Sequence, residues 1–163
     1  MRLVEGRAAV DDVDAFVERL SAIGDAHDAV VQAFDARYVA GREHLAAAAR
    51  SARRAIAHDD AIADDPAVEL LLYAAGRRQI DRALTIGVEA GEGPVVVAVD
   101  GGDEAGAAEA VEALLEPAAT LGAARDEAAI REYYGVTDAE LGATDATLED
   151  LVVERVALLA VEK

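Results

Sequence analysis

The strongest constraint on the fold of this chain is a run of valines that only a buried strand accommodates well. Val95 to Val97 follow Gly93-Pro94 and lead into turn residues that begin at Asp100, so the apolar run is bounded on both sides at strand length. β-branched residues favour the pleated, packed surface of a sheet. The pattern therefore predicts a strand over residues 95–99.

Two further strands and several helices are indicated by the spacing of apolar residues in the rest of the chain. The predicted strands are 3–10 and 29–34, and the predicted helices are one that begins near Val13 and ends at Gly24, then about 42–58, 66–75, 77–86, 103–115, 125–134, a short one from Thr137, and 148–160. These elements predict an α+β fold in which a small mixed, partly antiparallel sheet is covered by several helices. We expect one domain over residues 1–163.

Length and composition are those of a domain that folds on its own hydrophobic core. A chain of 163 residues buries roughly 70% of the surface that its unfolded form exposes. It has no cysteine, which excludes disulfides, thiolate metal sites and thiol nucleophiles. The N-terminus lacks a long apolar segment, and no later stretch is apolar over membrane-spanning length. We therefore expect a cytoplasmic protein.

The net charge limits the partners of this chain. There are 33 acidic and 15 basic residues, and Lys163 is the single lysine beside 14 arginines. An acidic excess with almost no lysine is typical of the solvated surface of a halophilic protein. Phosphate contacts require clustered cations, so the composition argues against binding to DNA or to a membrane surface. One local basic patch remains compatible with it.

A first basic patch is predicted on the helix at 42–58. The stretch from residue 37 to 58 holds five arginines and one acidic residue, Glu43. On a helix, four of these arginines fall within a sector of about 120° beside the apolar face. The set consists of Arg42, Arg50, Arg53 and Arg54, with Arg37 leading into it. Such a face is expected to attract an anionic partner, and the alternative is that its arginines pair with the acidic loop at 59–65.

A second basic cluster follows Gly76, where Arg77, Arg78 and Arg82 stand at the start of a predicted helix. Backbone amides and the helix dipole would add positive potential at that position. The two readings are again an anion-binding site and ordinary surface ion pairs.

No catalytic, cofactor or metal site is predicted. The segment Asp100-Gly101-Gly102-Asp103-Glu104 follows a strand and opens a helix, but its carboxylates repel phosphate and it lacks the glycine-lysine pattern of a phosphate loop. A turn and a helix cap explain it. The acidic loop at 58–65 lacks the glycine and terminal glutamate of a calcium loop. The three histidines lack metal-ligand spacing and are expected at the surface or at helix caps.

The segment 66–88 resembles a known family. Glu69, Leu71 and Leu72, then Arg78-Gln79-Ile80, then Ala83 and Gly87 occur in an order similar to that of the PRPK-binding protein family, and residues 32–44 are similar as well. The resemblance implies a non-catalytic subunit of the KEOPS complex, in a halophilic archaeal version. Members bind and stimulate the atypical kinase/ATPase of the complex, which makes threonylcarbamoyladenosine in tRNA. In archaea they help to recruit tRNA by its 3′ CCA end.

Under this resemblance the two arginine clusters are the predicted tRNA surface. Part of the kinase interface is expected on an apolar stripe of the C-terminal helix with neighbours on the helix at 66–75: Leu148, Leu151, Val152, Val156, Leu159, Leu71 and Tyr73. The alternative is that the stripe belongs to the core, as we expect for at least half of these side chains. Two other functions stay open: a regulatory domain that senses a small molecule between the valine strand and the Gly101-Gly102 turn, and an enzyme without a recognisable motif.

Overall fold

An antiparallel sheet lies at the centre of the computed structural model, which describes residues 1–143 and 145–162. The strand order is β2-β3-β1-β4, and the strands are β1 (Arg2–Val10), β2 (Val30–Asp35), β3 (Gly91–Asp100) and the two-residue β4 (Glu116–Pro117). The pairs β1–β3, β1–β4 and β2–β3 are all antiparallel. The predicted α+β class is confirmed, and the sheet has no parallel pair among the described residues.

The valine run lies in β3, between β1 and β2, and its residues 95 to 99 are buried. The strand is longer than the predicted 95–99 because it keeps pairing with β1 as far as Gly91. Pro94 lies in the part of β3 that pairs with β1 alone, because the pairing with β2 starts at Asp35 and Val95.

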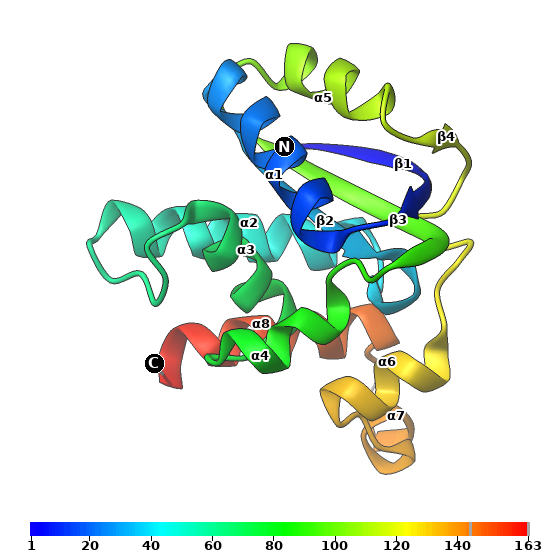
Figure 1. Ribbon diagram of the computed structural model, residues 1–163. Helices are drawn as coiled ribbons and strands as arrows, with labels where there is room; N and C mark the ends of the chain where they lie inside the picture. The colour runs from blue at the N-terminus through cyan, green and yellow to red at the C-terminus, as the bar shows by residue number, and fades with distance from the viewer. Residues whose placement is uncertain (144, 163) are drawn as a thin grey trace.

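Two helices cover one face of the sheet. These are α1 (Val13–His27) and α5 (Glu104–Glu112), seen above the strands in Figure 1. Phe16 and Leu20 of α1 and Val111 of α5 pack with Val97 and Val99 of the sheet in one buried cluster. Alternate residues of β1 are buried on this face, which is the period expected of a strand with one face in the core.

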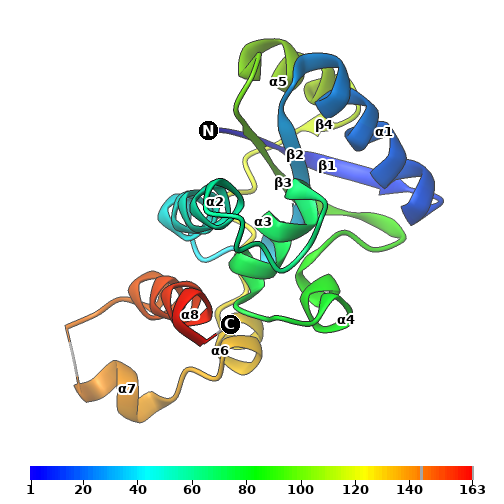
Figure 2. The same cartoon turned by 90° about the vertical axis from the view of Figure 1, so that its left-hand side faces the viewer.

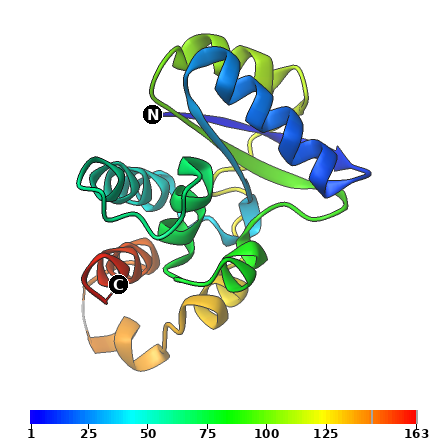
Figure 3. The same ribbon diagram turned by 60° about the vertical axis from the view of Figure 1, so that its left-hand side comes forward.

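The opposite face carries the larger helical layer. It contains η1 (Ala36–Tyr38), α2 (Arg42–Ala57), α3 (Pro66–Ala75), α4 (Ile80–Ala83), η2 (Leu84–Ile86), α6 (Glu127–Tyr134), α7 (Asp138–Ala143) and α8 (Leu148–Glu162) (Figure 2). Phe34, Val96 and Ala98 of the sheet pack against this layer. Helix α3 lies inside it, because every residue from 69 to 75 is buried. Figure 3 shows α2, α3 and α8 next to one another below the sheet.

Several predicted helix boundaries were wrong, since α5 ends at Glu112 and α6 begins at Glu127. Helix α1 continues through Gly24 to His27, because Asp28 itself adopts the left-handed conformation and its N–H donates to the Gly24 carbonyl. The predicted helix 77–86 is reduced to α4 and η2. The amide of Arg77 donates to the Leu72 carbonyl and closes the end of α3, so residue 77 cannot begin a new helix.

The turn after β3 packs directly against the end of α1. Gly102 has a φ of 56°, and a Cβ atom there would lie 2.0 Å from the Asp28 carbonyl oxygen. The next residue, Asp103, donates its N–H to the His27 carbonyl at 2.8 Å and caps α5 by accepting from the Gly106 amide at 3.0 Å. The interpretation of this segment as a turn and a helix cap is confirmed.

Glu69 is a fully buried carboxylate that organises the loop before α3. Its oxygens accept from the Ile62 amide at 3.0 Å and from the Ala63 amide at 2.8 Å. Backbone N–H groups in a loop have no ladder to satisfy them, and a carboxylate that accepts two of them is a strong partner. The glutamate that helps to carry the family resemblance is therefore a structural residue.

His44 is buried inside the larger helical layer, although a surface or cap position was expected. Its Nδ1 accepts from the Ala40 amide at 3.1 Å, so the proton resides on Nε2, which donates to the Ala74 carbonyl at 2.8 Å. The hydroxyl of Tyr134 donates to the same carbonyl at 2.9 Å. One carbonyl near the end of α3 thus accepts hydrogen bonds from side chains of α2 and α6.

Burial lowers the pKa of His44 to about 4, against an opposing effect of the hydrogen bond to Ala74. The unfolded chain therefore binds more protons than the folded chain between roughly pH 6.5 and pH 4. We predict that His44 lowers the free energy of unfolding by about 2 kcal/mol between pH 7 and pH 5. Urea titrations at several pH values should show a shallower pH dependence in His44→Gln than in the wild type. If the free energy of unfolding depends on pH equally in the two proteins, the prediction is wrong. The difference between their free energies of unfolding at pH 7.5 measures the loss of packing alone.

Candidate nucleic-acid interface

The three arginines after Gly76 have different environments. Gly76 has a φ of 64° and ends α3 in the left-handed conformation. The guanidinium of Arg77 donates to the Tyr133 carbonyl and lies 4.4 Å from the centre of the Tyr133 ring. A partly buried cation over an aromatic face is attracted by the ring quadrupole. Arg77 therefore joins the turn after α3 to α6, and its main contacts are within the protein.

Arg78 and Arg82 are the exposed members of this cluster. Arg82 donates to the Gln79 side-chain oxygen at 3.0 Å, and Arg78 has no hydrogen bond or ion pair in the described part of the chain. Ile80 and Leu84 are exposed beside them. The segment therefore presents two available cations next to two apolar side chains. Helix α4 has four residues, so the expected contribution of a helix dipole is small.

Tyr133 supports this segment from α6. Its hydroxyl donates to the Arg82 carbonyl at 2.7 Å, and its ring packs edge to face with Tyr38 at 5.8 Å and with Tyr134 at 4.9 Å. Burial raises the pKa of the Tyr133 phenol, and the nearby Arg77 opposes the shift. Tyr134 is buried and Tyr133 is half-buried at the rim of the core, and no sequence signal linked Tyr133 to the arginines.

The arginines of α2 are largely paired, although their partners are outside the predicted loop at 59–65. Arg50 lies 2.5 Å from the Glu43 carboxylate, and Arg53 lies 3.2 Å from the Asp100 carboxylate. Arg42 donates to the Met1 carbonyl at 3.3 Å. Arg54 is exposed and takes part in no ion pair among residues 1–143 and 145–162. A phosphate that bound this face would compete with carboxylates at two of its four cations.

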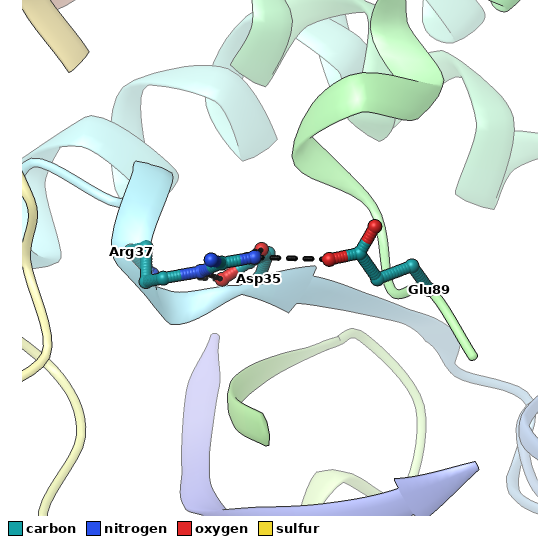
Figure 4. A network of polar contacts seen from close by, with 3 residues as sticks. All are labelled: Asp35, Arg37 and Glu89. Carbon is teal, nitrogen blue, oxygen red and sulfur yellow. Dashed lines mark hydrogen bonds and ion pairs between the residues drawn. The ribbon is translucent and has the colours of Figure 1, made fainter. Parts of the chain in front are cut away.

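Arg37 is held between two carboxylates, as Figure 4 shows. Its guanidinium lies 2.6 Å from Asp35 and 3.0 Å from Glu89, and the Asp35 side chain also accepts from the Arg37 amide at 3.0 Å. The hydrogen bond to Asp35 is the main reason that the pKa of Arg37 is raised above its ordinary value. The residue ties the end of β2 to the segment before β3, and an anionic ligand would have to displace its partners.

The apolar stripe expected at the kinase interface lies in the core of this protein. All seven side chains are buried: Leu71, Tyr73, Leu148, Leu151, Val152, Val156 and Leu159. Such side chains cannot reach a partner unless α8 or α3 leaves its place, so a contact with a kinase through them stays an untested prediction. The large apolar side chains that α8 exposes are Leu158 and Val161, at 44% and 81%.

The acidic turn after β3 is occupied by groups of the protein itself. The N-terminal ammonium lies 3.7 Å from Asp100 and 3.2 Å from Glu104, and Glu104 accepts from the Gly101 amide at 2.7 Å. This hydrogen bond is the main reason that the pKa of Glu104 is lowered. In the described part of the chain no group of His, Cys, Asp and Glu side chains is placed to hold a metal, and no helix is long and apolar enough to cross a membrane.

Comparison with known proteins found one family model that matches this chain. The family model described as kinase binding protein CGI-121 matches residues 9–160, from the last residues of β1 into α8. A search of curated proteins found no match.

The different environments of Arg77 and Arg78 predict different effects on stability. Arg77→Ala removes the hydrogen bond to Tyr133 and the cation–π contact, so it should lower the free energy of unfolding by about 1–2 kcal/mol. Arg78→Ala changes an exposed side chain and should stay within about 0.5 kcal/mol of the wild type. Urea denaturation of the two variants at neutral pH measures both values. Equal effects would mean that the contacts of Arg77 contribute nothing to stability.

Proposed function

This chain belongs to the CGI-121 family of kinase binding proteins, and on that basis we propose that it is a non-catalytic subunit of a KEOPS complex. In this role it binds and stimulates a PRPK-type kinase/ATPase and helps to recruit tRNA through its 3′ CCA end. The observation that carries the proposal is the family match over residues 9–160. It agrees with the resemblance found in residues 66–88, while a halophilic archaeal source stays a prediction.

The arginine segment after α3 is the part of the protein best suited to the proposed contact with tRNA. Arg78 is without an intramolecular partner among the described residues, and the Arg82 guanidinium makes a single hydrogen bond, to the neutral side chain of Gln79. The exposed Ile80 lies between these cations along the chain, and the exposed Leu84 follows Arg82. Phosphates are held by arginines, and unstacked bases at a single-stranded end pack on apolar surfaces. Arg54 and Arg42 of α2 would extend the contact.

A surface for the kinase on α8 has to use its outer side, since its inner stripe is core. Leu158 and Val161 are exposed there, and exposed apolar groups on a highly acidic protein are suited to a partner because their burial is favourable whatever the net charge. We therefore place the kinase contact of α8 on these two residues, in place of the buried stripe.

Co-purification with a PRPK-type kinase tests the proposed partner. We predict that the wild-type chain retains the kinase, that Leu158→Glu with Val161→Glu lowers retention about tenfold or more, and that melting is unchanged. The matched control adds two glutamates at exposed alanines, Ala105→Glu in α5 with Ala113→Glu just after it. A wild type that retains no such kinase would refute the proposed function. Equal retention by both double variants would refute only the placement on α8.

Binding of tRNA tests the arginine segment. We predict that Arg78→Glu with Arg82→Glu weakens tRNA binding about tenfold or more and lowers the slope of log K against log salt by about 0.7–0.9 for each phosphate lost. The matched control, Arg2→Glu with Arg19→Glu, makes the same change of charge at exposed arginines elsewhere. Filter binding over a range of salt concentrations measures both. If the two double variants bind alike, the segment is not the tRNA site, and a tRNA without its CCA end that binds at full strength excludes recognition of that end.

A further inference from the structure

One sheet edge borders a groove that the proposed function does not use. β2 is an outer strand of the sheet, paired with β3 on one side and with no strand on the other among the described residues. A groove of about 400 Å³ runs beside it, between α1, β2 and the first turn of α3. Figure 3 shows these three elements around the same edge. The arginine segment lies beyond the far end of α3, after Gly76.

In the described part of the chain β2 has no strand on this side, and its residues 30 to 33 line the groove. The Ala33 carbonyl accepts from its neighbour's side chain, Gln32 Nε2, at 2.8 Å. An outer strand with open backbone groups is a template for an additional strand, and strand addition is a common mode of peptide recognition in which the main chain supplies much of the affinity.

Apolar side chains line the groove and its mouth. Val17 of α1 is 48% exposed at the groove, and the partly buried Val30, Val68 and Val88 also contribute to its walls. Alternate side chains of an added strand would point to the two sides of the sheet, toward α1 and toward α3. Every second residue of the occupant is therefore expected to be apolar.

The charge around the groove indicates which side chains the bound segment carries at its other positions. Asp25, Asp28 and Asp65 are exposed along it, and no lysine or arginine belongs to the described residues that line it. The two arginine clusters lie elsewhere, on α2 and after Gly76. An anionic or nucleic-acid ligand is repelled here, whereas lysine and arginine side chains of a peptide meet complementary charge.

We propose that this groove binds an extended, basic segment of a partner protein, which pairs with β2 as an additional strand. The segment alternates apolar and cationic side chains. The inference goes beyond the proposed function, because the groove is separated by the length of α3 from the segment assigned to tRNA.

The test uses a synthetic octapeptide of alternating valine and lysine, acetylated and amidated, added to the isotopically labelled full-length protein. We expect saturable changes of the amide NMR signals concentrated at residues 30–33 and along α1. Two control peptides separate the contribution of charge from that of backbone hydrogen bonds. Replacing lysine by glutamate should weaken binding about tenfold or more. Methylating alternate backbone nitrogens, which keeps the charge, should weaken it to a similar extent if the peptide pairs as a strand.

A pair of matched variants locates the site. Ser21→Arg with Asp25→Arg changes exposed groove residues and should weaken peptide binding about tenfold or more. Ala105→Arg with Glu109→Arg makes the same change of charge on α5 and should bind like the wild type. The proposal is overturned if the peptide causes no saturable shift at β2 up to millimolar concentration, if backbone methylation has no effect, or if both variants weaken binding equally. The groove variant should still retain the kinase and tRNA. That result shows that the groove proposal and the proposed function can fail independently of each other.

Discussion

The burial of α3 from Glu69 to Ala75 is the constraint on which the rest of the structure depends. Residues 69 to 75 have protein on every side, so sheet, α2, α4 and α8 must all pack against one short helix. Polar groups at both ends of α3 are paired with side chains. Asp65 accepts from the Ala67 amide at the start, while Glu69 holds the loop before the helix. His44 and Tyr134 donate to the Ala74 carbonyl near the end. An interior helix cannot leave such groups unpaired without a large cost. The groove and the arginine segment lie at the two ends of this fixed element.

The elements of the fold were largely predictable because they follow from local patterns. The valines of β3, the apolar spacing of α2 and α8 and the proline that begins α3 all act over a few residues, and each element was placed correctly. One error arises where a distant contact overrides the local pattern. β4 exists because Glu116–Pro117 meet Gly6 and Arg7 of β1, and no feature of its two residues indicates a strand. The short α4 has a local cause, because the Arg77 amide donates to the Leu72 carbonyl and closes α3.

The candidate site was predictable in composition and less so in geometry. Clustered arginines in an acidic chain are visible in a sequence, but which of them are available depends on carboxylates far along the chain, as with Arg53 and Asp100 or Arg37 and Glu89. Periodicity also cannot separate a core stripe from a docking stripe, since both are apolar with the same spacing. On α8 the regular stripe is core, and the exposed Leu158 and Val161 stand outside that pattern. The groove beside β2 had no sequence signal, because it is built from three separate segments.

The contact between Gly102 and the end of α1 affects how mutational scans of this protein should be interpreted. Any side chain at this position would collide with the carbonyls of His27 and Asp28. It would separate the turn after α1 from the turn before α5, and these two turns hold both helices in place. Loss of function on its replacement would therefore report misfolding. A glycine that tolerates no change beside a strand and a helix start is easily mistaken for a nucleotide-binding residue, and here main-chain crowding is a sufficient explanation of that intolerance.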